Sequence, residues 1–213
     1  MFGFHLELRL KLNNNKCATI VVVRIVISAH FDIARPVMSI KMDNENLMGL
    51  VDNFAGVFVA YQTSRKTGTP VYFTNYEELE FDGAEDVAKS LDRDTLVIVV
   101  DATMDAENKT AYLGNAYGFS TEPLKKDFSD KITFKDGMFE ETEDETIIYG
   151  GKYGLKTFYF GVPIPDPNAG IENPFPKPGA YHTTDNKVSL DAIDKASDVL
   201  TELIQWFSKN NKS

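Results

Sequence analysis

An apolar run rich in β-branched side chains, Ile20–Ile27, constrains the fold of this chain more than any other stretch. Only Arg24 interrupts it. Such a run is typical of a strand that helices cover on both faces of an α/β sheet. The strand is predicted to end at Ser28-Ala29, which places His30 at its carboxyl end.

An aspartate, Asp32, follows that histidine by two residues. A neutral imidazole binds a metal through one ring nitrogen, and a nearby carboxylate can hold the N–H of the other. His30 and Asp32 therefore suit a metal ligand and the group that orients it. Alternatively, His30 packs at the rim of the sheet and Asp32 caps a loop, so more residues are needed to decide.

Helices and strands alternate after this motif. Apolar residues at helical spacing from Met48 to Arg65 predict a helix that starts near Asp52-Asn53 and stops at Thr67-Gly68. The pattern predicts further strands at 71–74, 95–100 and 156–162, and further helices at 84–91 and 190–207. This order predicts an α/β protein with three layers, α/β/α, around a mixed, largely parallel central sheet.

Other parts of the chain have less regular patterns. Residues Ile132–Phe139 are interpreted as a hairpin that turns at Asp136-Gly137, and the acidic run Glu140–Glu145 as a solvated edge. A proline-rich loop, 163–178, leads to Tyr181-His182 and suits the wall of a pocket. We expect a single domain over residues 1–213, with a short N-terminal hairpin at 1–28.

Composition excludes several classes of protein. The net charge of −10 argues against nucleic acid or an anionic membrane surface as a partner. The single cysteine, Cys17, excludes an intramolecular disulfide bond. No apolar run reaches the roughly 18 residues of a membrane span, and the N-terminus lacks a signal-peptide pattern. We therefore expect a cytoplasmic protein that does not associate with membranes.

Polar residues stand just past the predicted strand ends or at a helix start. In a parallel sheet of this kind, ligands bind in the crevice outside the carboxyl ends of the strands. Two of the three histidines of the chain belong to this set. Each residue has a simpler interpretation as a cap or a solvated strand end, but together they predict a metal site; the set is His30, Asp52, Glu77-Glu78, Asp101 and His182.

At these positions the sequence resembles the co-catalytic di-zinc exopeptidases, a family typified by bacterial leucyl aminopeptidase and related to glutamate carboxypeptidase II and glutaminyl cyclases. The resemblance covers roughly residues 18–207, and the motifs occur in the family's order. The matching pieces are Ser28-Ala-His-Phe-Asp32, Asp52-Asn-Phe-Ala-Gly56, Glu77-Glu78, Val100-Asp101 and Tyr181-His182-Thr183.

The resemblance implies a role for each of these residues. His30 and Asp101 would bind one metal, and Glu78 and His182 the other. Asp52 would bridge the two metals and would be followed by a cis peptide bond. Asp32 would orient His30, and Glu77 would be the general base that does not touch a metal.

These roles imply a zinc-dependent exopeptidase with two divalent metals, zinc being the expected one. The implied mechanism is attack by a hydroxide that bridges the metals, with Glu77 as the base. An aminopeptidase acting on peptides or small amides is the preferred interpretation, because acidic surroundings favour a substrate ammonium group. Only 29 residues precede His30, fewer than is usual in the family, so a second copy of the chain is a candidate to cover the exposed face.

Alternative functions stay open. A glutaminyl cyclase or an N-acyl deacylase would use the same scaffold, and a carboxypeptidase would need an arginine for the substrate carboxylate, for which Arg35 is the candidate. The remaining alternative is a metal-binding or interaction protein without turnover.

Overall fold

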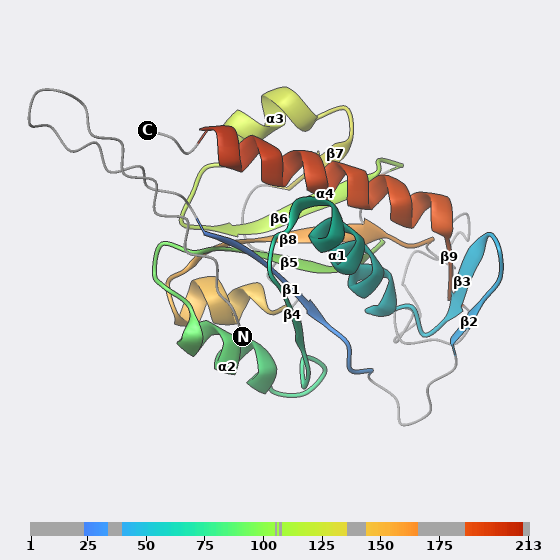
Figure 1. Cartoon of the computed structure of the whole chain (residues 1–213), viewed down its shortest axis with the longest axis horizontal. Helices are drawn as coiled ribbons and strands as arrows, with labels where there is room; N and C mark the ends of the chain where they lie inside the picture. The colour runs from blue at the N-terminus through green and yellow to red at the C-terminus, as the bar shows by residue number, and fades with distance from the viewer. Residues whose placement is uncertain are drawn as a thin grey trace, which may run out of the picture.

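A computed structural model describes residues 24–33, 40–104, 106, 108–135, 144–165 and 186–210. Its central sheet has six strands in the order β4-β1-β5-β8-β6-β7 (Figure 1). The strands are β1 (Ile25–His30), β4 (Val71–Thr74), β5 (Leu96–Thr103), β6 (Ala111–Tyr117), β7 (Ile132–Phe134) and β8 (Lys156–Pro163).

The sheet is mixed and mostly parallel, as the sequence predicts. Strand β1 pairs in parallel with β4 on one side and with β5 on the other, and β5 pairs in parallel with β8. Only the pairing of β6 with β8 is antiparallel among the described strand pairs of this sheet. All six residues of β1 are buried, which explains the continuous apolar run.

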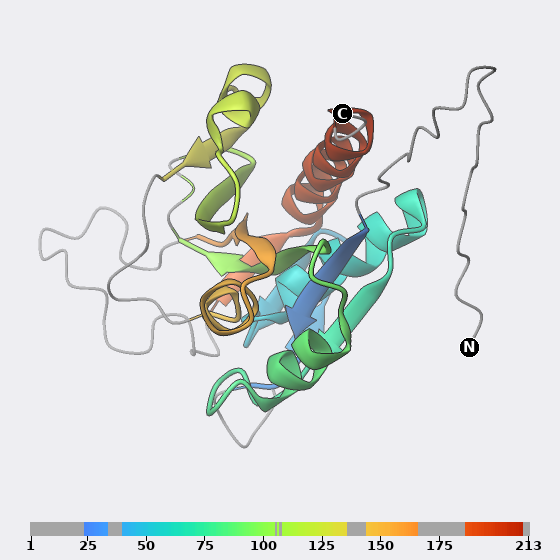
Figure 2. The same ribbon diagram turned by 90° about the vertical axis from the view of Figure 1, so that its left-hand side faces the viewer.

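Helices cover both faces of the sheet (Figures 1 and 2). One face carries α1 (Phe54–Thr67) and α4 (Leu190–Asn210), which pack together, with α3 (Glu122–Phe128) near the β7 edge. The other face carries α2 (Asp82–Ser90) and a short π-helix, η1 (Ile147–Lys152). Each helical layer has its own apolar cluster against the sheet, so the predicted three-layer α/β/α architecture is confirmed.

Several elements differ from the sequence prediction. A second sheet of three antiparallel strands was not expected: β2 (Ile40–Met42), β3 (Asn46–Gly49) and β9 (Asn186–Ser189). These strands are too short and polar to give a clear period-2 pattern. Strand β5 continues through Asp101 to Thr103, so Asp101 lies inside a strand and not after its end.

The interpretation of Glu140–Glu145 as a solvated edge is wrong for its last two residues. Asp144 is 5% exposed and Glu145 only 1% exposed. Both lie directly before η1, which packs on the sheet beside α2. The other predictions for 1–23, Asp136-Gly137, the proline-rich loop and His182 lie outside the described residues. Among the helices of the described ranges, none is long and apolar enough to cross a membrane.

Candidate metal centre

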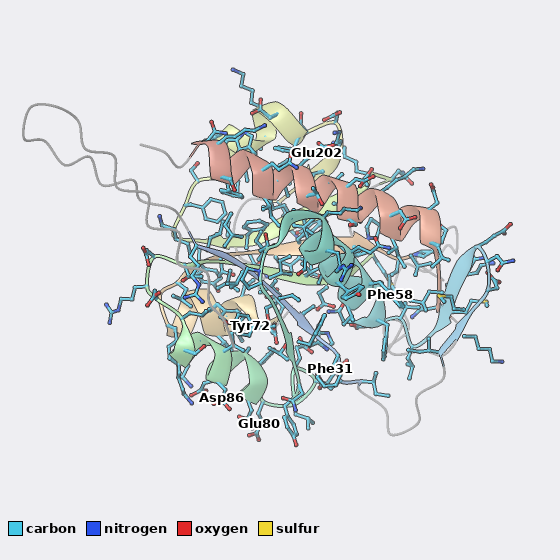
Figure 3. The ribbon with its side chains drawn as sticks, in the orientation of Figure 1. Phe31, Phe58, Tyr72, Glu80, Asp86 and Glu202 are labelled. Atoms are coloured by element: carbon cyan, nitrogen blue, oxygen red, sulfur yellow. The ribbon has the colours of Figure 1, made fainter. Side chains whose placement is uncertain are left out.

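Three adjacent strands bring the predicted site residues to one edge of the sheet. His30 is the last residue of β1, Asp101 lies near the end of β5, and Glu77-Glu78 form a turn after β4. Asp52 comes directly before α1, whose first turn lies against β5. Figure 3 labels Phe31, which follows His30 in the chain, and Glu80, which lies two residues after Glu78.

Carboxylates surround the imidazole of His30, whose side chain is 3% exposed. Its Nε2 atom lies 3.3 Å from Asp101 Oδ1, 3.4 Å from Asp52 Oδ1 and 3.9 Å from Glu77 Oε2. One ligand atom each from His30, Asp52 and Asp101 lie within 4.8 Å of one another, and so do atoms of His30, Glu77 and Glu78. The two groups share His30, so they form one continuous centre.

Asp32 connects the two halves of this centre. Its Oδ1 atom lies 3.5 Å from His30 Nδ1, the ring nitrogen that faces away from Asp101. The same carboxylate accepts the backbone N–H groups of Glu77 at 3.3 Å and Glu78 at 3.4 Å. The orienting role expected for Asp32 therefore extends, in geometry, to the turn that carries both glutamates.

The start of α1 fixes the position of Asp52. The Asp52-Asn53 peptide bond is cis, as the resemblance implies. The Asn53 side chain donates to Val100 O of β5 at 2.8 Å and accepts the Gly56 N–H at 3.0 Å, which makes it the N-cap of α1. A Cβ atom on Gly56 would lie 2.1 Å from Asn53 Oδ1 and 2.7 Å from Val100 O, so only glycine permits this close approach.

The accumulation of negative charge changes the proton affinity of the site residues. Burial and the charge of Asp101 raise the pKa of Glu77 to about 9. Burial, with the charge of Asp52 adding to it, raises the pKa of Asp101 to about 7. Burial alone would lower the pKa of His30, but Asp101 and the other neighbouring carboxylates hold it well above its usual value.

These properties fit divalent metal ions. One imidazole and four carboxylates converge, and zinc accepts both kinds of ligand. A carboxylate with two oxygens, such as Asp52, can contact two metals. Burial and the neighbouring carboxylates raise the pKa of Glu77 and Asp101, and bound cations would oppose that rise. His182, the remaining predicted ligand, lies outside the described ranges.

One carboxylate close to this centre was missed by the sequence analysis. Glu145 accepts hydrogen bonds from the hydroxyls of Ser28 on β1 and Thr74 on β4. Burial raises its pKa, although these two hydrogen bonds act in the opposite direction. Its position next to other acidic residues gave no signal, because nothing in an acidic run separates a buried glutamate from solvated ones.

Comparisons with known proteins identify the fold. No protein-family model matches the sequence, and no curated protein does so either. Among solved structures, the aminopeptidase APDkam598 of the archaeon Desulfurococcus kamchatkensis matches 78% of the chain at a TM-score of 0.52 and 14% identity. The TET aminopeptidase of a marine sediment thaumarchaeote also matches 78%, at a TM-score of 0.53 and 16% identity. A third structure, that of the dodecamer PhTET1-12s, matches 78% of the chain at a TM-score of 0.53 and 14% identity.

The matched part is about half of each of these proteins: 51%, 50% and 53% of their respective lengths. At such low identity the likeness concerns the fold. The described chain therefore has the α/β fold of solved aminopeptidases.

Proposed function

We propose that this chain is a metal-dependent exopeptidase, and specifically a zinc aminopeptidase that removes N-terminal residues from peptides. The observation that carries the proposal is the convergence of His30, Asp52, Glu77, Glu78 and Asp101 at the carboxyl edge of β1, β4 and β5. The fold around them is one that solved aminopeptidases share. Fold and site thus support the same class of chemistry.

In the proposed centre, His30 and Asp101 would hold one metal, Glu78 and His182 would hold the other, and Asp52 would be a ligand to both. Bound divalent cations would polarise the scissile carbonyl and lower the pKa of the attacking water. Asp32 keeps the imidazole of His30 oriented and holds the glutamate turn through two N–H groups.

Glu77 accepts the proton of the attacking water and passes it to the leaving amine. Its carboxylate lies 3.9 Å from His30 Nε2, at the rim of the cluster. Glu77 must be ionised for this role, and positive charge bound among its neighbours would lower its pKa from the raised value of about 9. The acidic surroundings also favour a substrate with a free α-ammonium group.

An assembly of several copies is part of the proposal. PhTET1-12s, which shares the fold, is a dodecamer, and a second copy could cover a face of this chain. The oligomeric state is measured by light scattering of the purified protein.

The test of the proposed activity compares Glu77→Gln with Glu80→Gln. Glu80 is an exposed carboxylate three residues further along the same loop. Substrates are short peptides with free, N-acetylated or N-terminal glutamine ends, and products are identified by mass spectrometry. Glu77→Gln is expected to keep its bound zinc and to lose about 10²–10⁴-fold in kcat, whereas Glu80→Gln keeps full activity.

Each alternative function gives a different result in this panel. Cleavage of acetyl groups, removal of C-terminal residues or cyclisation of glutamine would replace the aminopeptidase proposal. Full hydrolysis by Glu77→Gln would exclude the mechanism. Zinc content in His182→Ala tests the second metal: it is expected to fall from two ions per chain to one, and an unchanged value would remove His182 from the ligand set.

A further inference from the structure

A buried carboxylate, Glu145, lies behind the proposed centre and contacts both strands that carry its two halves. It belongs to a segment more than forty residues after Asp101 in the chain. Its Oε2 atom accepts the Ser28 hydroxyl of β1 at 2.7 Å, and its Oε1 atom accepts the Thr74 hydroxyl of β4. The side chain thus bridges two neighbouring strands with one oxygen on each.

The hydroxyl groups of Ser28 and Thr74 lie close to the site residues, both along the chain and across the sheet. Ser28 precedes His30 by two residues, and Thr74 is paired with His30 in the parallel register of β1 and β4. The Phe31 N–H donates to Thr74 O at 3.0 Å, which continues the pairing just beyond His30. Three residues after Thr74, the turn with Glu77 and Glu78 begins. A change at Glu145 would therefore reach both halves of the site.

A third hydroxyl supports this arrangement. Tyr149 Oη, in η1, lies 2.9 Å from Ser28 Oγ. Since the Ser28 proton is donated to Glu145, Tyr149 is the donor in this contact. η1 thus supplies Tyr149, and Glu145 lies two residues before η1, so both groups reach β1 from neighbouring positions of one segment.

A buried carboxylate is an expensive way to hold a fold together. Removing such a group from water costs several kcal/mol before its hydrogen bonds offset the loss, and an apolar side chain often stabilises a core equally well. The neighbouring carboxylate, Asp144, makes hydrogen bonds away from β1 and β4. It accepts the Asn115 side-chain amide at 2.6 Å and the Thr146 N–H at 2.7 Å. Glu145 instead bridges those two strands.

We propose that Glu145 is a positioning residue: by holding the ends of β1 and β4 together, it sets the spacing between His30 and the Glu77-Glu78 pair. The contacts of Glu145 with Ser28 and Thr74 support its structural role, and its effect on catalysis rests on the proposed function. Glutamine in its place would offer one acceptor oxygen and could no longer accept both hydroxyls.

The experiment compares Glu145→Gln with Asp144→Asn, its neighbour of similar burial and hydrogen bonding. Amide hydrogen exchange is measured at Phe31, Glu77 and Glu78. Glu145→Gln is expected to accelerate exchange at these amides at least tenfold more than Asp144→Asn does, because Asp144→Asn acts on them only through overall stability. In the active enzyme Glu145→Gln is expected to lower kcat by about 10–100-fold with little change in KM.

A second pair of variants covers the case in which Glu145→Gln does not fold. Thr74→Val removes the hydroxyl at nearly constant volume, and Thr74→Ser keeps it. Thr74→Val is expected to reproduce the faster exchange, and Thr74→Ser to behave like the wild type. Equal exchange in both Thr74 variants, or equal acceleration in Glu145→Gln and Asp144→Asn, would overturn the proposal. A wild-type protein without peptidase activity would contradict the proposed function, while the exchange data would still decide the role of Glu145.

Discussion

Two groups of carboxylates approach β1, one through Glu145 at Ser28 and the other at His30, and their surroundings differ. At Ser28, the carboxylate of Glu145 accepts two hydroxyl donors, and the adjacent Asp144 accepts an amide and a backbone N–H. At His30, carboxylates converge on one imidazole and on one another. Asp144 and Glu145, the inner group, have the hydrogen-bond donors of a structural site. The outer group has the excess negative charge of a cation site; it consists of Asp52, Glu77, Glu78 and Asp101.

The two groups show that this fold places acidic residues in two different electrostatic environments. Burial raises the carboxyl pKa in both groups. For Glu145, hydrogen bonds from Thr74 and Ser28 are the main influence against the rise, whereas for Glu77 the charge of Asp101 is the main addition to the effect of burial. Substitutions in the outer group should therefore act mainly on metal binding. Those in the inner group should act on folding and, at Glu145, also on the position of the outer residues.

The largest effect is expected from Asp101→Asn. This variant removes a charged ligand that lies 3.3 Å from His30 Nε2. Loss of an orienting partner alone costs about 10–100-fold in metal affinity, and loss of a ligand should cost more than 100-fold. Competition with a chelating dye measures the affinity. The control is Asp86→Asn, at a carboxylate that is 82% exposed on α2 and is expected to have no effect.

The stability of the metal-free protein should change in the opposite direction. Asp101→Asn removes a buried charge from a repelling group, so its free energy of unfolding at pH 8 should rise. Asp144→Asn in the inner group should lower the same quantity by about 1–3 kcal/mol, because the Asn115 amide loses its carboxylate partner. If urea unfolding gave the same sign for both variants, the distinction between the two groups would be wrong.

A smaller effect is expected from Gly56→Ala, which acts on the outer group through α1. The added Cβ would lie 2.1 Å from Asn53 Oδ1, so the first turn of α1 and Asp52 before it must move. Overpacking of this kind costs about 1–3 kcal/mol. The matched variant is Gly68→Ala at the other end of α1, where φ is +74° and no neighbouring atom lies within 4 Å of the added Cβ.

Both glycine variants should lower the free energy of unfolding, but only Gly56→Ala should also weaken metal binding. Unfolding in urea and metal titration of the same samples separate the two effects. Equal metal affinity in the two variants would show that the start of α1 does not position the outer group.

The sequence was sufficient to predict the outer group but not the inner one. Runs of buried β-branched residues identify β1 and β5, and site residues that lie at or near the ends of such strands can be predicted with them. Glu145 reaches its partners only because the chain just before η1 lies against β1 and β4, a contact between residues more than seventy positions apart. Local pattern carries no information about such a contact. The strands of the second sheet were missed for another reason, because they are too short and polar to give a clear period-2 pattern.

The smallest effect is a pH dependence that separates the two groups by their response to metal. A carboxyl group with a higher pKa in the folded state binds more protons there than in the unfolded state, so stability falls as pH rises. For Asp101 this occurs between about pH 4 and 7, and for Glu77 up to about pH 9; the raised pKa of His30 acts in the same direction above about pH 6.5.

The metal-free protein should therefore lose thermal stability as the pH rises from 5 to 8. Stoichiometric zinc should remove the share of this loss that comes from the outer group. A difference of about 2 kcal/mol at pH 8 would correspond to roughly 4–8 °C in Tm for a chain of this size. Calorimetry with and without zinc measures both slopes. In Asp101→Asn the metal-free slope should be shallower, whereas in Glu80→Gln it should equal that of the wild type. A slope that zinc leaves unchanged would assign the pH dependence to the inner group, because Asp144 and Glu145 also have raised pKa values and do not face the proposed metals.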